Sequence, residues 1–291
     1  MKTIGIENVA VVTSELELAF AKYEKMGFKL TPCSEHFVDS PGGEQHAHRN
    51  RYAMFGNRTY FEIVTSPLTY LKAPGYDEAL AKYGEHLAKI MFAFDDVKGV
   101  EKAVEARGGV SPYPADVMVR VWQSEETGEE HIVPMDTYAF PEAIWYGFFA
   151  CALHHQAPQH NYVAEYLTHP NGVLGVSECL LHVENADETA EAFAAYLGTA
   201  PRKNADSIVL DFANRTRLSI YDGDAIEARL GLYRPSRRPS FAALAFATPA
   251  VDAVRRILDG NGVPYASTPG GLAVDPEAAL NAICLFEEPR P

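Results

Sequence analysis

The chain has 291 residues, which is enough for two ordinary domains or one large one. Its 47% hydrophobic and 22% charged residues are typical of a globular protein with a sizeable core. The 25 basic and 39 acidic residues give a net charge of −14, which repels the phosphates of nucleic acids and of anionic lipids. We therefore expect neither nucleic acid nor a membrane as a partner. Since the sequence shows no secretory leader and no apolar run of 18 residues, we expect a cytoplasmic protein.

Motifs of two common enzyme classes are missing from the sequence. It contains no glycine-rich phosphate loop ending in Lys-Ser or Lys-Thr and no Gly-x-Ser-x-Gly elbow, so phosphoryl transfer and serine hydrolysis have no support. The 4 cysteines show no paired spacing and are interpreted as buried, reduced thiols.

A strand, a capped helix and a terminating glycine are predicted within Ile4–Phe28. The apolar run 6–12 comes first, Ser14 then has the side chain of a helix N-cap, and Glu17 completes a capping box. Gly27 follows the last helical turn, where a residue in the left-handed conformation ends a helix at least cost.

This pattern occurs four times along the chain. Each copy has an apolar run, a capping residue and a glycine 13 or 14 residues later, the later pairs being Asp95 and Gly108, Asn185 and Gly198, and Thr248 and Gly262. The spacing is too long and too unequal for a solenoid and favours four homologous half-domains. We predict modules at 3–66, 84–153, 175–222 and 239–288. They form an N-terminal domain (1–153), an inter-domain segment (154–174) and a C-terminal domain (175–291).

The first module carries a polar stretch between its helix and its last strands. Residues 29–50, which include His36, His46 and His48, are interpreted as a polar loop that precedes a hairpin of 51–55 and 60–65. Glu62 interrupts the apolar second arm of this hairpin. Strand alternation allows an outward position for Glu62 on a half-buried sheet, whereas an inward carboxylate would mark a functional site. The sequence leaves both positions open.

The second module and the inter-domain segment hold further candidates. Residues 67–83 are expected to form a crossover with a short helix, strand 87–94 carries Lys89, and the aromatic strand 144–153 either lines a pocket or belongs to the core. The inter-domain segment is rich in groups that titrate or bind metal, namely His154, His155, His160, Glu165 and His169. Functional residues concentrate on such loops, although these side chains could equally satisfy the backbone of an irregular linker.

These features resemble the vicinal oxygen chelate (VOC) superfamily, which includes glyoxalase I, extradiol dioxygenases and bleomycin-resistance proteins, and most closely its glyoxalase-like domain proteins. The resemblance rests on IENVAVVTSELELAFAKYEKMGF, NRYAMFGNRTYFEIV and HHQAPQHNYVAEYLTHPNG, and it spans nearly the whole chain. It implies an α+β fold of four βαβββ modules that pair into two curved-sheet cups. Function transfers less directly than fold, because the superfamily hosts many reactions.

In metal-using members of the superfamily, the ligands come from the first and last strands of paired modules. By this resemblance Glu62 matches the family's glutamate and Ser219 does not, and the first-strand positions lack the usual histidine, being Asn8, Lys89, Cys179 and Ala242. One solution is a rebuilt site in which Glu62, His154 and His155 hold one Fe(II), Mn(II) or Zn(II) ion. The other is a cup without metal, in which Glu62 and a histidine act as general base and acid.

The resemblance thus predicts a VOC-type lyase, isomerase or dioxygenase that acts on a small, partly apolar, oxygen-bearing substrate. Its expected catalytic residues are Glu62, His154 and His155, and its expected substrate-binding residues are Asn8, Asn50, Tyr60, Lys89, Phe149 and His169. The alternatives are a metal-free protein that binds or sequesters a small molecule, and a structural protein without a pocket. The sequence leaves the oligomeric state open, a homodimer included.

Overall fold

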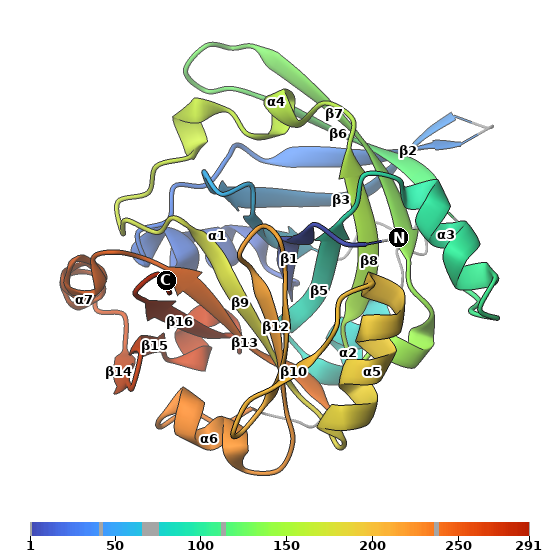
Figure 1. Ribbon diagram of the computed structural model, residues 1–291. Helices are drawn as coiled ribbons and strands as arrows, with labels where there is room; N and C mark the ends of the chain where they lie inside the picture. The colour runs from blue at the N-terminus through green and yellow to red at the C-terminus, as the bar shows by residue number, and fades with distance from the viewer. Residues whose placement is uncertain (1, 41–42, 66–75, 112–114, 236–238, 291) are drawn as a thin grey trace.

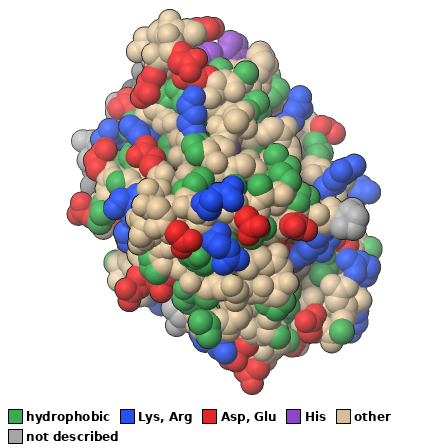
Figure 2. All heavy atoms as spheres, turned by 90° about the vertical axis from the view of Figure 1, so that its left-hand side faces the viewer, with side chains coloured by type: hydrophobic (Ala, Val, Ile, Leu, Met, Phe, Trp, Pro, Cys, Tyr) green, Lys and Arg blue, Asp and Glu red, His purple; other side chains and the backbone are tan. Residues whose placement is uncertain are grey.

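The structure, a computed structural model, describes residues 2–40, 43–65, 76–111, 115–235 and 239–290. Four times along the chain, a strand and a helix are followed by three strands, which confirms the expected α+β fold of βαβββ modules (Figure 1). None of the described helices is long and apolar enough to cross a membrane. On the face drawn in Figure 2, basic and acidic side chains are interspersed, and histidines are visible at its upper end.

The first two modules occupy the N-terminal half. The first contains β1 (Gly5–Thr13), α1 (Leu16–Lys25), β2 (Ser34–Ser40), β3 (Gly43–Met54) and β4 (Tyr60–Thr65). After α2 (Tyr76–Tyr83), the second contains β5 (His86–Ala93), α3 (Val97–Glu105), β6 (Asp116–Gln123), β7 (Glu130–Ala139), η1 (Glu142–Ile144) and β8 (Phe149–His155). The short helices α4 (Pro158–Asn161) and η2 (Ala164–Tyr166) follow. The crossover expected at 67–83 lies mostly outside the described residues, and its described end is α2.

The last two modules are shorter. The third contains β9 (Gly175–His182), α5 (Ala186–Leu197), β10 (Arg202–Lys203), β11 (Ile208–Asp211) and β12 (Arg217–Tyr221), and α6 (Ala225–Leu230) follows it. The fourth contains β13 (Ser240–Ala247), α7 (Val251–Gly260), β14 (Tyr265–Thr268), β15 (Gly271–Val274), η3 (Pro276–Ala279) and β16 (Ile283–Glu287).

The strands form one closed barrel and one open sheet. Strands β1 to β8 close in the order β1-β4-β3-β2-β6-β7-β8-β5, whereas β9 to β16 form an open sheet in the order β10-β11-β12-β9-β13-β16-β15-β14. In every module the first strand pairs in parallel with the last, and two pairs of first strands, β1 with β5 and β9 with β13, are antiparallel. The four modules therefore pair as first with second and third with fourth.

The helices begin later than expected in three modules. The structure has Glu15, Asp96 and Ala250 at the N-caps in place of Ser14, Asp95 and Thr248, so these three expectations are wrong. In α1 the cause is Thr13 at the strand end, whose hydroxyl accepts a hydrogen bond from Glu15 N at 3.0 Å and adds a turn before the helix. The cap at Asn185 is confirmed, and all four terminating glycines have φ between 65° and 83°.

The polar stretch of the first module is not a loop. Its described residues form the long strands β2 and β3, which pair with each other antiparallel. The prediction failed because a barrel interior can be polar. His48, Asn50 and Tyr52 alternate along β3 with the residues that face the other way, so the period of two is carried by polar side chains.

The outer face of the barrel packs against its helices and against the C-terminal sheet. Phe61 of β4 meets Tyr23 of α1 with ring centroids 4.8 Å apart, and Phe246 of β13 with centroids 5.7 Å apart. Phe28 adds a contact with Phe246 at 5.0 Å. The barrel and the sheet thus share one hydrophobic core, while the barrel keeps a separate apolar lining inside.

Two copies of the tripeptide Asn-Arg-Thr join the halves reciprocally, and we call them the clasp turns (57–59 and 214–216). Asn57 Nδ2 donates to Val176 O at 3.2 Å, and Val176 N donates to Thr59 Oγ1 at 2.9 Å. The second turn repeats these two bonds on β1, from Asn214 Nδ2 to Ile6 O at 2.8 Å and from Ile6 N to Thr216 Oγ1 at 2.9 Å. The strand residue beside each asparagine is a glycine, Gly5 or Gly175, where a Cβ would collide with the asparagine side chain.

Candidate active site

Polar side chains gather inside the barrel. On β4, Tyr60 and Val64 belong to the inner lining, whereas Phe61 and Ile63 pack outward. Glu62 therefore faces inward, and it is only 1% exposed, which decides between the two positions that the sequence left open. We call the buried group around it the barrel cluster, which consists of His36, His48, Asn50, Tyr52, Glu62, Lys89 and Arg120.

Glu62 is the centre of the barrel cluster. Lys89 Nζ lies 2.6 Å from its Oε2, and Asn50 Nδ2 donates to its Oε1 at 2.5 Å. His48 Nε2 lies 3.5 Å from the same Oε1. Burial alone would raise the pKa of Glu62, but the Lys89 ammonium and His48 outweigh burial and hold this pKa well below its usual value. The carboxylate is therefore ionised at neutral pH, and Lys89 is protonated.

The two histidines of the barrel cluster are neutral. Burial is the main cause that lowers the pKa of both His36 and His48. Their rings lie 4.2 Å apart, and Tyr52 Oη lies 2.7 Å from His36 Nε2. Neutral imidazoles have a lone pair available for a proton or a metal ion.

Arg120 brings a second cation into the barrel. Its side chain is fully buried, and its three hydrogen-bond partners are neutral, namely Ser34 Oγ at 2.9 Å, Asn161 Oδ1 at 3.0 Å and Thr31 Oγ1 at 3.2 Å. Within the described part of the chain, no carboxylate forms a salt bridge with Arg120. Burial lowers the pKa of Arg120 to about 10, so the guanidinium stays charged at neutral pH. The barrel cluster therefore holds two cations and one carboxylate.

The donor atoms of the barrel cluster fit a divalent metal ion. One carboxylate oxygen of Glu62 and one ring nitrogen each of His36 and His48 lie within 4.8 Å of one another. Two neutral imidazoles and a carboxylate are ligands that Fe(II), Mn(II) and Zn(II) accept. Asn8 indicates that a bound molecule belongs in the barrel. Its side-chain amide is fully buried, and neither its nitrogen nor its oxygen has a hydrogen-bond partner among the described residues.

The predicted substrate-binding residues divide into two groups. Asn50 and Lys89 belong to the barrel cluster, Phe149 belongs to the inner lining of the barrel, and Asn8 is buried on β1 opposite Tyr60. Tyr60 also faces inward, and its hydroxyl lies 3.3 Å from His155 Nε2. His169 is not brought to the cluster.

The bonds of His169 hold the inter-domain segment to the first module. Its Nδ1 accepts a hydrogen bond from Lys29 N at 3.0 Å, and its Nε2 lies 2.7 Å from Met54 O. Its ring packs on Phe55 at 4.8 Å. Both ring nitrogens are thus used by backbone groups, which gives His169 a structural role.

The structure does not bring His154 and His155 to Glu62. Among the described residues, the group of possible metal ligands around Glu62 contains His36 and His48 instead. His154 and His155 are successive residues of β8, so their side chains point to opposite faces of the strand, and His154 Nδ1 lies 3.0 Å from Phe94 O. A metal site of Glu62, His154 and His155 does not form.

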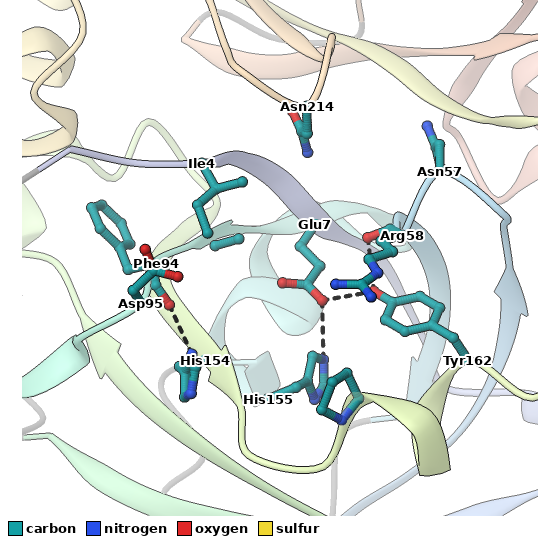
Figure 3. Close-up of a pocket in the computed structure, with 12 residues that line it drawn as sticks. Ile4, Glu7, Asn57, Arg58, Phe94, Asp95, His154, His155, Tyr162 and Asn214 are labelled. Atoms are coloured by element: carbon teal, nitrogen blue, oxygen red, sulfur yellow. Dashed lines mark hydrogen bonds and ion pairs between the residues drawn. The ribbon is translucent and has the colours of Figure 1, made fainter.

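Instead, both histidines line a cavity of about 220 Å³ beside one end of the barrel (Figure 3). Glu7 is its central carboxyl, 2.7 Å from Tyr162 Oη and 3.6 Å from His155 Nε2. A β-bulge between Ile6 and Asn8 turns Glu7 out of the ladder. Burial raises the pKa of Glu7 to about 7, and burial lowers the pKa of His155 to about 3.

Sequence reasoning missed His36, His48, Tyr52 and Arg120. The signal for His48 and Tyr52 was present as alternation along 43–54, but it was hidden because the inward residues are the polar ones. His36 lies on the neighbouring strand β2, which was interpreted as part of the same polar loop. Arg120 gave no local signal, since its role depends on the barrel closing between β2 and β6.

The fold is that of the VOC superfamily. The chain matches the family model of the glyoxalase-like domain over residues 9–197, about two thirds of its length, and it therefore belongs to that family. No curated protein sequence matches it.

Several solved structures share the fold across nearly the whole chain. They include a hypothetical protein from Staphylococcus aureus (9% identity, TM-score 0.62, 97% of this chain and 98% of that chain), the Mn(II)-bound glyoxalase from Novosphingobium aromaticivorans (11%, 0.60, 99% and 82%) and a mutant of 4-hydroxymandelate synthase from Streptomyces coelicolor (13%, 0.57, 92% and 78%). At these identities, the likeness shows the fold alone.

Proposed function

We propose that the chain is a glyoxalase-like enzyme whose active site is the barrel cluster and whose substrate is small, partly apolar and oxygen-bearing. The observation that carries this proposal is the buried, ionised Glu62 beside two neutral imidazoles. The charge of Lys89 and Arg120 exceeds that of Glu62 by one, so the site attracts a substrate oxygen with negative charge, and a bound divalent ion would add to this attraction. The apolar lining, to which Phe149 belongs, suits the rest of such a substrate.

His36, His48 and Glu62 would hold a divalent metal ion in this enzyme. When bound, such an ion supplies Lewis acidity to neighbouring oxygens, which serves lyase, isomerase and dioxygenase chemistry alike. Lys89 keeps Glu62 ionised, Tyr52 fixes the orientation of the His36 ring, and Asn8 offers a donor and an acceptor to a substrate oxygen. The Mn(II)-bound glyoxalase with the same fold makes manganese a suitable first ion to test.

Elemental analysis after anaerobic reconstitution with Fe(II), Mn(II) or Zn(II) tests the metal site. We expect the wild type to contain about one ion per chain more than His36→Ala/His48→Ala. The double variant His154→Ala/His155→Ala is the matched control and should keep that ion. Equal metal content in wild type and His36→Ala/His48→Ala would refute the metal site.

Turnover tests the enzymatic role of the same residues. Diols, catechols and α-oxo compounds are the classes to screen, and Glu62→Gln should lose the activity that the wild type shows. If Glu62→Gln kept full activity on a substrate found in this way, the barrel cluster would not be the active site.

A metal-free binding protein is the second candidate, and Lys89 favours it. Its ammonium already gives Glu62 the positive charge that a metal ion would supply. Lys89→Met separates the two functions. In a metal enzyme this variant should bind the ion more tightly, because a competing cation is gone. In a metal-free protein it should bind no ion and should lose affinity for anionic ligands.

A further inference from the structure

A second group of possible metal ligands lies outside the barrel cluster. Glu129, just before β7, His131 of β7 and His160 of α4 place a carboxylate oxygen and two ring nitrogens within 4.8 Å of one another. The two imidazoles face each other through their Nδ1 atoms, which are 3.4 Å apart. A strong hydrogen bond to nitrogen or oxygen is shorter, about 2.7–3.2 Å. Two nitrogens bound at about 2.0–2.1 Å to one tetrahedral zinc ion lie about 3.3 Å apart, so the observed spacing fits a shared ion.

Trp122 of β6 holds both histidines in place. Its indole stacks on the His131 ring, with centroids 4.4 Å apart and an interplanar angle of 25°, and its Nε1 donates to His160 O at 3.1 Å. The third ligand is fixed by its backbone, since Ser124 N donates to Glu129 O at 2.9 Å across the hairpin turn. The His131 ring and the backbones of His160 and Glu129 are thus held in place, which lowers the conformational freedom lost when these residues bind a metal ion.

We propose that Glu129, His131 and His160 form a binding site for a divalent transition-metal ion such as zinc, separate from the barrel cluster. Glu129 is exposed, so a water molecule can occupy the fourth position. The ion would fasten α4 to the β6–β7 hairpin. Because α4 also supplies Asn161, a partner of Arg120, the ion would stiffen the barrel wall beside the barrel cluster.

Calorimetric titration of the metal-stripped full chain with ZnCl₂ tests this site. We expect His160→Gln to bind one zinc ion fewer per chain than the wild type, and Glu129→Gln to bind that ion at least about tenfold more weakly. Glu130→Gln is the matched control, since Glu130 is an exposed neighbour outside the ligand group, and it should bind zinc as the wild type does. The variant His36→Ala/His48→Ala should keep this zinc ion, which separates the proposal from the metal site in the barrel.

Fluorescence locates the ion. The chain has 2 tryptophans, so Trp145→Phe leaves Trp122 as the only reporter. Ni²⁺ should quench this reporter at the same stoichiometry as zinc binding, and His160→Gln should abolish the quenching. Zinc affinity and stoichiometry unchanged in both His160→Gln and Glu129→Gln would overturn the proposal, as would zinc loss confined to His36→Ala/His48→Ala. If His160→Gln fails to fold, Glu129→Gln decides, because its side chain is exposed.

Discussion

The barrel and the C-terminal sheet place their buried carboxylates at different positions of the same framework. By strand register, Asn8 opposite Tyr60 in β1 and β4 corresponds to Glu178 opposite Arg217 in β9 and β12. Two residues further along, Glu62 corresponds to Ser219. The carboxylate therefore lies on the last strand of the first module and on the first strand of the third.

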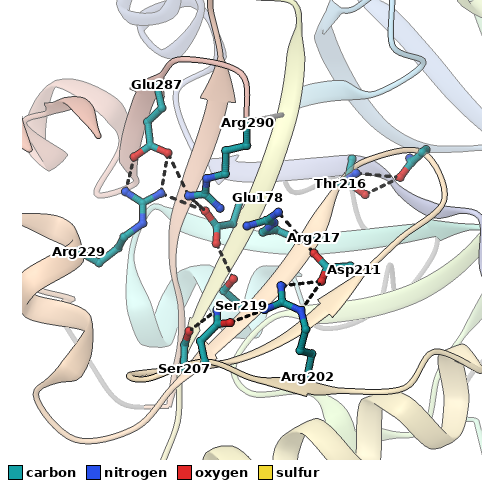
Figure 4. Close-up of polar contacts among 12 residues, drawn as sticks. Glu178, Arg202, Ser207, Asp211, Thr216, Arg217, Ser219, Arg229, Glu287 and Arg290 are labelled. Carbon is teal, nitrogen blue, oxygen red and sulfur yellow. Dashed lines mark hydrogen bonds and ion pairs between the residues drawn. The ribbon is translucent and has the colours of Figure 1, made fainter. Parts of the chain in front are cut away.

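The two regions also balance their charges differently. In the sheet, Glu178 lies 3.0 Å from Arg229 and 2.7 Å from Arg290, and Glu287 pairs with the same two arginines (Figure 4). The negative charges of the two carboxylates are therefore balanced by the positive charges of the two guanidinium groups. The barrel cluster has two cations and one carboxylate, and the buried amide of Asn8 has no hydrogen-bond partner among the described residues. The charges of the barrel cluster are not balanced within the cluster, which is why the barrel is the better candidate for the active site.

The largest expected effect comes from breaking the ion pair of the barrel. Glu62→Gln leaves the Lys89 ammonium buried without its counter-charge, so we expect the free energy of unfolding to fall by about 3–5 kcal/mol in urea denaturation. Ser219→Ala, at the matching position of the sheet, removes one hydrogen bond and should cost about 1 kcal/mol. Glu62→Gln/Lys89→Met should recover most of the loss. Equal losses for Glu62→Gln and Ser219→Ala would remove the distinction between the regions.

The next effect comes from the sheet. Arg229→Met removes a cation shared by Glu178 and Glu287, and we expect the free energy of unfolding to fall by about 2–3 kcal/mol. The loss is limited because Arg290 still contacts both carboxylates. The metal content and ligand affinity of the barrel should not change. A loss of barrel metal in Arg229→Met would show that the two charge clusters are functionally coupled.

Glu7 sharpens the comparison through its pH dependence. Its counterpart in the sheet is Ser177, which does not titrate. Glu7 keeps its proton up to a pKa of about 7 in the folded chain but releases it near 4.5 when unfolded, so its contribution to stability is complete below pH 4.5 and is lost as the pH rises to 7. Glu7→Gln should therefore be more stable than the wild type by about 2–3 kcal/mol at pH 8, with little difference at pH 4, in urea titrations at both values. A difference independent of pH would contradict this.

The smallest expected effect concerns the clasp turns, the feature that the two regions share. Asn57→Ala and Asn214→Ala each remove the asparagine side-chain bond of one clasp turn to the opposite strand, and each should lower the free energy of unfolding by about 1–2 kcal/mol in thermal or urea denaturation. The two losses should agree within the error of the measurement. A large difference between the two losses would mean that the two clasp turns contribute unequally to the stability of the protein.

The architecture was predictable because each module repeats local chemistry. Apolar strands, helix starts and terminating glycines are set by neighbours in sequence, and the four glycines kept their expected role. The exact helix starts were not predictable from capping residues alone, because Thr13 and Thr248 at the strand ends insert a turn before α1 and α7.

The site was predictable only where a residue broke its local pattern. Glu62 stood out in an apolar strand, and its partner Lys89 did so in another. His36 and His48 did not, because the polar alternation of the barrel interior was taken for a loop. His155 was chosen for its type, but the direction of a side chain on a strand depends on register, which a single sequence does not fix.

The clasp turns have a consequence for the origin of the chain. Residues 1–155 contain both a clasp turn and the strand start that the other clasp turn binds, so two copies of this half could join through the same four hydrogen bonds. At this junction the present chain is arranged like a dimer whose two subunits are tethered by residues 156–174. The tether makes the association intramolecular, at an effective concentration that no longer depends on how much protein the cell makes.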